Sequence, residues 1–120
     1  MPALVERTTQ EGTPTTLTVA GSPRALPAGL DLALYRIVQE ALTNVRRHSG
    51  ASRCEVCVDY GPDRITVAVV DDGHGTSTGE GGGHGLLGMR ERVSLYGGEL
   101  SAAPGPTGGF AVRASLPVTP

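Results

Sequence analysis

The stretch EALTNVRRHSG, residues 40–50, ends a run of helical periodicity and carries the single asparagine of the chain. Before and within it, apolar side chains recur at the spacing of one helix face: Leu34, Ile37, Val38, Ala41, Leu42 and Val45. At the helical rotation of ~100° per residue, a polar set occupies the sector beside that face, namely Glu40, Asn44, Arg47 and His48. We therefore expect a helix from Asp31 to about His48, with a polar stripe at the rim of its buried face.

The chemistry of this stripe has two interpretations. Amide and carboxylate oxygens suit a hard cation such as Mg²⁺, and arginine and histidine suit phosphate. An ordinary solvated helix edge with i, i+4 pairs explains the same residue types. The helix alone does not decide between a ligand site and a surface.

Length and charge exclude several classes of protein. The chain has 120 residues and a formal net charge of −2, which indicates one domain without a basic field for nucleic acid. No apolar run approaches the ~20 residues of a membrane span, so we expect no direct membrane contact and a cytoplasmic location. All ten basic residues are arginine.

The rest of the chain predicts a layered α+β sandwich. Alternating or β-branched stretches predict strands at residues 15–21, 53–60, 64–71, 99–105 and 109–117, with hairpins joining the second to the third and the fourth to the fifth. A second helix is expected over residues 86–96. Cys54 and Cys57 alternate to opposite faces of one strand, so we interpret this CxxC pair as ordinary strand residues.

Two glycine-containing stretches add candidate ligand positions. In VVDDGHG, residues 69–75, an apolar strand ends in Asp71, whose carboxylate can accept from an exocyclic amine such as that of adenine. By itself this is also a common turn. In GGGHGLLG, residues 81–88, glycines precede a helix whose N-terminal amides can face an anion. A flexible linker explains that stretch equally well, and a chain without lysine cannot form a Walker A loop.

The order and spacing of these stretches closely resemble the N, G1 and G2 boxes of the GHKL ATPases. The similarity is sharper to the ATP-binding domain of two-component sensor histidine kinases, in the subfamily paired with NarL/LuxR-type response regulators. It covers residues 15–117 and includes LALYRIVQEALTNVRRHSGAS, VVDDGHG, GHGLLGMRERVSLYGGEL and GGFAVRASLP. The resemblance implies a Bergerat fold, a two-layer sandwich in which a mixed sheet packs against helices and ATP lies under a short, glycine-rich lid at residues 76–82.

The resemblance also implies roles for single residues. Glu40 matches the candidate general base, Asn44 the Mg²⁺ ligand, and Arg47 and His48 positions near the phosphates. Asp71 matches the carboxylate that receives the adenine amino group. The glycines and their neighbours around the lid match positions that shape the pocket or face the phosphates: Gly73, Gly75, Gly83, His84, Gly85, Leu86 and Gly88.

There are departures and open alternatives. Phe110 stands where a threonine often follows the closing glycine pair of the family, and Arg90 and Arg92 can reach either phosphate or a neighbouring glutamate. No acceptor histidine segment occurs, so residues 1–14 are expected to be the end of a connection to a histidine-bearing dimerisation domain, with residues 15–120 as the catalytic domain. The alternatives are a stand-alone GHKL anti-sigma factor with serine kinase activity and a non-catalytic ATP-sensing domain.

Overall fold

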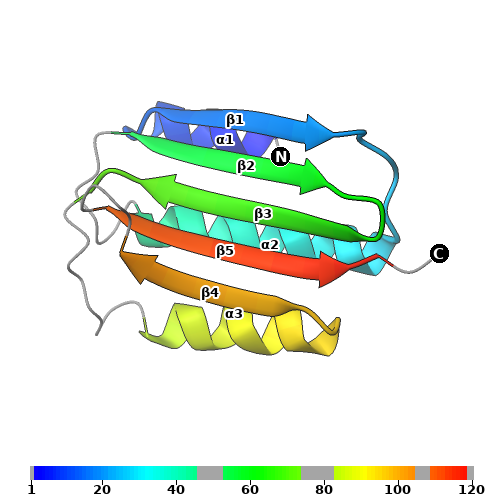
Figure 1. Ribbon diagram of the computed structural model, residues 1–120. Helices are drawn as coiled ribbons and strands as arrows, with labels where there is room; N and C mark the ends of the chain where they lie inside the picture. Colours follow the sequence, from blue (N-terminus) through cyan, green and yellow to red (C-terminus); the bar gives the residue numbers. More distant parts are fainter. Residues whose placement is uncertain (1, 46–52, 74–82, 105–108, 119–120) are drawn as a thin grey trace.

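The computed structural model describes residues 2–45, 53–73, 83–104 and 109–118, with the backbone alone for residues 2, 83–86 and 104. Along the chain the elements are α1 (Pro2–Gln10), β1 (Thr15–Gly21), α2 (Ala28–Asn44), β2 (Cys54–Tyr60), β3 (Arg64–Asp71), α3 (Gly83–Leu95), β4 (Glu99–Pro104) and β5 (Phe110–Pro117). The strands form one sheet in the order β1-β2-β3-β5-β4 (Figure 1).

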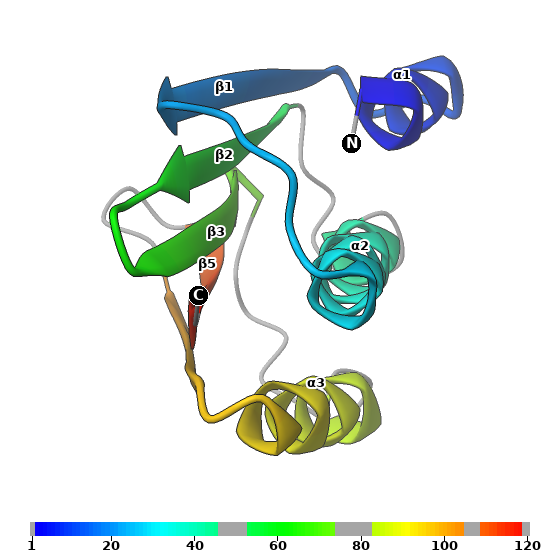
Figure 2. The same cartoon turned by 90° about the vertical axis from the view of Figure 1, so that its right-hand side faces the viewer.

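The sheet is mixed, because β1 runs parallel to β2 while the other neighbouring strands are antiparallel. The helices α1, α2 and α3 all lie against the same face of this sheet, as the view along its edge shows (Figure 2). The predicted two-layer α+β sandwich and both predicted hairpins are confirmed. None of the helices in the described residues combines the length and apolar composition that crossing a membrane requires.

The core lies between the two layers. All six apolar residues of the predicted α2 stripe are buried, and they pack against the inward-facing residues of β2, β3 and β5. On β3 the inward residues Ile65, Val67 and Val69 alternate along the strand, as the period of two requires. This alternation places the last residue of the strand, Asp71, on the helix side of the sheet as well.

Two helix boundaries differ from those predicted. Helix α2 begins at Ala28 and not at Asp31, because Pro27 is extended (φ −52°, ψ 142°) and stands at the N-cap, where its missing N–H costs nothing. The amide of Asp31 donates to the Pro27 carbonyl at 2.9 Å and closes the first turn. Helix α3 begins at Gly83 and takes in glycines that the sequence assigned to the loop.

A short helix, α1, forms where no element was predicted. Its Leu4 and Val5 are buried and join the core. The Thr9 hydroxyl accepts from the Thr15 amide at 2.9 Å and donates to the Thr15 carbonyl at 3.2 Å, which fixes the end of α1 to the start of β1. Residues 2–10 thus pack on the domain, and their continuation into a dimerisation domain stays a prediction.

Candidate functional site

Several helices and strands begin or end at one end of the sheet. Helix α2 ends there at Asn44 and strand β3 at Asp71, while α3 begins there at Gly83 and β5 at Phe110 (left-hand end in Figure 1). Helix α2 packs against both β3 and α3. The described parts of the three stretches that the sequence singled out are therefore brought to the same end of the fold.

Asp71 is a buried carboxylate with a fixed orientation. Asp71 is only 6% exposed, and Cys54, its partner on β2, is buried too. The amide of Gly73 donates to Asp71 Oδ1 at 2.7 Å, and the backbone amide of Phe110 also hydrogen-bonds the carboxylate. Two amides therefore hold the group from the turn after β3 and from the start of β5.

Burial raises the pKa of Asp71 above its ordinary value of 3.8, because desolvation penalises the charged form. The amides of Gly73 and Phe110 act in the opposite direction, and the neighbouring Asp72 charge raises the pKa further. A desolvated carboxylate that is already aimed is a strong acceptor for a polar hydrogen on a ligand.

Gly109 is a site residue that the sequence analysis did not single out. A Cβ at this position would collide with the Asp71 carbonyl and would lie 3.0 Å from the Cα of Asp72. Only glycine allows the start of β5 to approach the end of β3 this closely. The signal in the sequence was the glycine pair before Phe110, the second member of which is Gly109.

Glu40 and Asn44 lie one helical turn apart on α2, and both are partly buried. Their neighbours Ala41 and Leu42 are almost fully buried in the core. The predicted position of this polar pair at the rim of the apolar face is therefore confirmed, whereas their chemical roles stay predictions.

The start of α3 contains the remaining described candidates. The backbone of Gly83, His84, Gly85 and Leu86 forms its first turn, so the amides of a helix N-terminus lie at this end of the sheet. Gly88 is a helical glycine, and apart from its own helix backbone none of the described residues has an atom within 4 Å of the place where a Cβ would stand. Packing against the described residues therefore does not require glycine there, although a glycine inside a helix costs about 0.5–1 kcal/mol.

Some predicted contacts fall elsewhere. The guanidinium of Arg90 donates to the carbonyl of Leu100 at 3.0 Å, so this side chain ties α3 to β4. Arg47, His48 and Gly75, like the expected lid at residues 76–82, lie outside the described residues.

The two cysteines behave as strand residues. Cys54 is buried and Cys57 is partly exposed on the opposite face of β2, and both thiols are free. Burial, aided by Asp71, raises the pKa of Cys54 to about 12, and burial also raises the pKa of Cys57. In the part of the chain that the structure describes, no group of three or more histidine, cysteine or acidic side chains could hold a metal ion.

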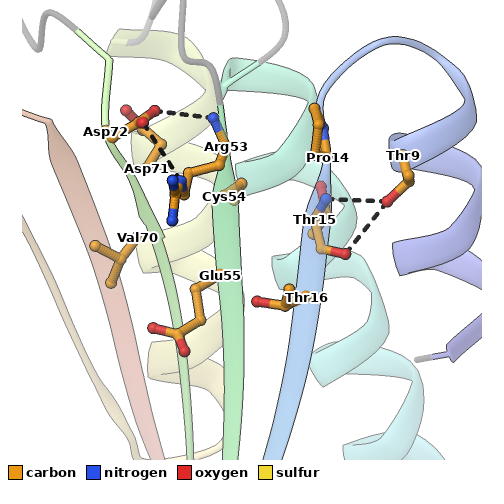
Figure 3. A pocket seen from close by; sticks show the side chains of 10 residues that line it. All are labelled: Thr9, Pro14, Thr15, Thr16, Arg53, Cys54, Glu55, Val70, Asp71 and Asp72. Carbon is orange, nitrogen blue, oxygen red and sulfur yellow. Dashed lines mark hydrogen bonds and ion pairs between the residues drawn. The ribbon is translucent and has the colours of Figure 1, made fainter.

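A groove of about 680 Å³ lies at the same end of the sheet, and Asp71 and Asp72 are among the residues that line it (Figure 3). Its lining runs from Thr9 and Thr15, past Arg53, to Asp71 and Asp72. Arg53 and Asp72 are linked across the start of β2 and the end of β3: the Arg53 amide donates to Asp72 Oδ1 at 2.9 Å. The guanidinium Nε lies 3.9 Å from Asp72 Oδ2.

Comparison with known proteins gives consistent relatives. The signal transduction histidine-protein kinase/phosphatase DegS of Brevibacillus brevis is 37% identical over 101 residues, which are 82% of this chain and 26% of DegS. The sensor histidine kinase LnrJ of Bacillus subtilis is 37% identical over 105 residues, 88% of this chain and 26% of LnrJ. The chain thus spans about a quarter of the length of these relatives.

Solved structures share the fold. The ATP binding domain of PrrB from Mycobacterium tuberculosis superposes with a TM-score of 0.67 at 26% identity, covering 98% of this chain and 93% of that one. The histidine kinase domain of a blue-light activated histidine kinase from Erythrobacter litoralis has a TM-score of 0.73 at 21% identity, covering 98% and 57%. A family model described as histidine kinase-, DNA gyrase B-, and HSP90-like ATPase matches residues 29–120. The chain belongs to this family of ATPases.

Proposed function

We propose that this chain is the catalytic domain of a sensor histidine kinase, which binds ATP with Mg²⁺ and transfers the γ-phosphoryl group to a histidine of a separate dimerisation domain. The observation that supports this most strongly is Asp71, a buried carboxylate held by two backbone amides where α2 and α3 also have their ends. Such a carboxylate is a suitable acceptor for the amino group of adenine.

The metal and the phosphates require other groups at the same end of the sheet. Asn44 would hold Mg²⁺ through its amide oxygen, a donor that this hard cation accepts. When bound, Mg²⁺ neutralises charge on the phosphates. The proposed phosphate contacts come from the end of the α2 segment and from the start of α3: Arg47, His48, Gly83, His84, Gly85, Leu86 and Gly88. Gly73 and Gly75 let the backbone approach the base.

The transfer itself needs little covalent work from the protein, because positioning and charge stabilisation dominate phosphoryl transfer. A nitrogen of the acceptor imidazole bonds to the γ-phosphorus as the bond from that phosphorus to ADP breaks. Glu40 takes the imidazole proton in this proposal. The domain works in the cytoplasm, and the phosphoryl group passes from the histidine to a NarL/LuxR-type response regulator. The isolated chain binds nucleotide with little turnover.

Binding is tested with a fluorescent ATP analogue, which the absence of tryptophan makes convenient. We expect Asp71→Asn and Asn44→Ala to weaken binding at least tenfold, the cost of about one charge-assisted hydrogen bond. Chelation of Mg²⁺ should weaken binding by the parent and have little further effect on Asn44→Ala. Asp59→Asn is the matched control, because Asp59 is an exposed carboxylate on β2. Parent-like affinity in both site variants would refute the assignment.

Transfer is tested by mixing the chain with the dimerisation domain of a sensor kinase and γ-labelled ATP. A phosphohistidine is labile to acid and stable to base, whereas a phosphoserine has the opposite stability. Acid-labile label on the dimerisation domain supports the proposal. Acid-stable label on a serine of a partner protein would favour the serine kinase alternative.

A further inference from the structure

Asp72 lies beside the site without belonging to its predicted contacts. It is the first residue after β3, and its side chain is 37% exposed and turned away from the helix layer (Figure 3). Asp71 points toward the helices and Asp72 toward the groove, as the alternation of a strand requires. Asp72 is therefore not placed to touch a base that Asp71 receives.

Asp72 nevertheless joins two strands at the point where Asp71 is held. Its amide donates to the Arg53 carbonyl at 3.3 Å, and its carboxylate accepts from the Arg53 amide at 2.9 Å. These bonds extend the β2–β3 pairing one residue beyond Asp71, whose partner on β2 is Cys54. The next residue, Gly73, donates the amide that orients the Asp71 carboxylate.

The links between Arg53 and Asp72 differ in strength. The bond from the Arg53 amide to the carboxylate is short and charge-assisted. The guanidinium contact is 3.9 Å long and involves an Arg53 side chain that is 81% exposed, so solvent screens it. The carboxylate oxygen that receives the Arg53 amide is therefore the important part of this pair, and the arginine side chain is the minor part.

We propose that Asp72 is a positioning residue for adenine recognition: by holding the end of β3 to the start of β2, it fixes the turn whose Gly73 amide aims the Asp71 carboxylate. This inference rests on the proposed binding of ATP through Asp71. It adds a residue that selects the base without contacting it. Loss of the Asp72 hydrogen bonds to Arg53 weakens the binding of adenine nucleotides and leaves unchanged the part of the affinity that comes from the phosphates.

The test uses base selectivity, which a general loss of stability does not change. We measure the dissociation constants of ATP, GTP and inorganic tripolyphosphate for the parent chain, Asp72→Ala, Asp72→Asn and Arg53→Ala. GTP is informative because guanine has a carbonyl where adenine has its amino group. Asp59→Ala, on the other end of the same hairpin, is the matched control.

We expect Asp72→Ala to weaken ATP binding about tenfold and to lower the preference for ATP over GTP by the same factor, with tripolyphosphate binding unchanged. Asp72→Asn keeps an oxygen for the Arg53 amide and should stay within about threefold of the parent, and Arg53→Ala within about twofold. In an Asp71→Asn background, Asp72→Ala should have no further effect on ATP affinity.

Two results overturn the proposal: an Asp72→Ala chain with the parent's selectivity, or an Arg53→Ala chain as defective as Asp72→Ala. If Asp72→Ala does not fold, Asp72→Ser is measured in the same way. Its hydroxyl oxygen can still accept a hydrogen bond, so the loss of selectivity should be smaller than that expected for Asp72→Ala. A failure of the proposed function gives a different result from a failure of this inference. In that case the parent chain would not prefer ATP over GTP, or Asp71→Asn would leave its preference unchanged.

Discussion

At one end of the sheet β2 turns into β3 and α3 turns into β4 through short turns, whereas at the other end α2 and β3 lead into the longer segments 46–52 and 74–82 (Figure 1). We call the first the closed end and the second the open end. At the closed end the Gly61 amide donates to the Arg64 carbonyl at 2.8 Å, and the Gly98 amide to the Val93 carbonyl at 3.0 Å.

The open end is arranged differently, because a buried carboxylate with a raised pKa stands there beside the ends of two helices. Backbone groups at the closed end bond to one another and hold the layers together. At the open end, the same kind of backbone amide is used to orient Asp71. Substitutions at the two ends should therefore separate stability from ligand binding.

The largest expected effect comes from Gly109→Ala at the open end. The added Cβ collides with the Asp71 carbonyl, so β5 and β3 must move apart. We expect unfolding to become easier by about 1–3 kcal/mol, together with at least tenfold weaker nucleotide binding by the folded chain, because the Phe110 amide moves away from Asp71. Thermal unfolding and binding of the fluorescent analogue measure the two effects.

Gly98→Ala is the matched change at the closed end. Its Cβ would lie 2.5 Å from the Ser115 carbonyl oxygen and 3.0 Å from side-chain atoms of Leu116 and Val93. We expect a similar loss of stability, about 1–3 kcal/mol, with an unchanged dissociation constant for the folded chain. Equal losses of affinity in both variants would show that the two ends are not separable.

The contrast between Asp71 and Gly109 shows which features can be predicted from a single sequence. The periods of 3.6 and 2 determine the buried faces of α2 and β3, so those elements and the position of Asp71 were predictable. Gly109 was not, because its need for glycine comes from the Asp71 carbonyl on another strand. Helix α1 escaped prediction for a related reason: its nine residues contain two threonines, and Leu4 and Val5 are buried through tertiary packing.

Cys54 gives a probe of opening at the open end, since it lies opposite Asp71 and is 2% exposed. In a Cys57→Ser chain, alkylation of Cys54 requires the strand end to open, because the buried thiol with a pKa of about 12 is unreactive. Nucleotide at 100 times its dissociation constant should slow alkylation up to about 100-fold. The Cys54→Ser chain, which reports on Cys57, should respond less. Equal protection of both thiols would indicate global unfolding as the route.

The raised pKa of Asp71 predicts a pH dependence that differs for binding and stability. Adenine binding needs the ionised carboxylate, so affinity falls as the pH falls through the raised pKa, up to about tenfold per unit. The amide introduced by Asp71→Asn imitates the protonated acid, and the affinities of the parent and this variant should therefore converge at low pH. Convergence only near the ordinary value of an exposed aspartate would contradict the effect of burial.

Stability without nucleotide changes in the opposite direction. Between the unfolded pKa and the raised folded pKa of Asp71, the folded chain holds a proton that the unfolded chain has released. The contribution of this group to stability therefore decreases as the pH rises through that window. At neutral pH, Asp71→Asn should consequently unfold no more easily than the parent while it binds nucleotide poorly, as measured by thermal unfolding.

The smallest expected effect belongs to Tyr96→Phe at the closed end. The Tyr96 hydroxyl donates to the Gly29 carbonyl at 3.0 Å and joins the turn after α3 to the first turn of α2. Its loss should cost about 1 kcal/mol or less, because the tyrosine is 39% exposed, and it should lower the unfolding temperature by a few degrees. Helices α2 and α3 both reach the open end, so this bond lies at the far ends of the two elements that carry the site. An unchanged dissociation constant for nucleotide means that the core holds these helices in place without the Tyr96–Gly29 bond. A change of more than twofold would reveal coupling along the helices from the closed end to the open end.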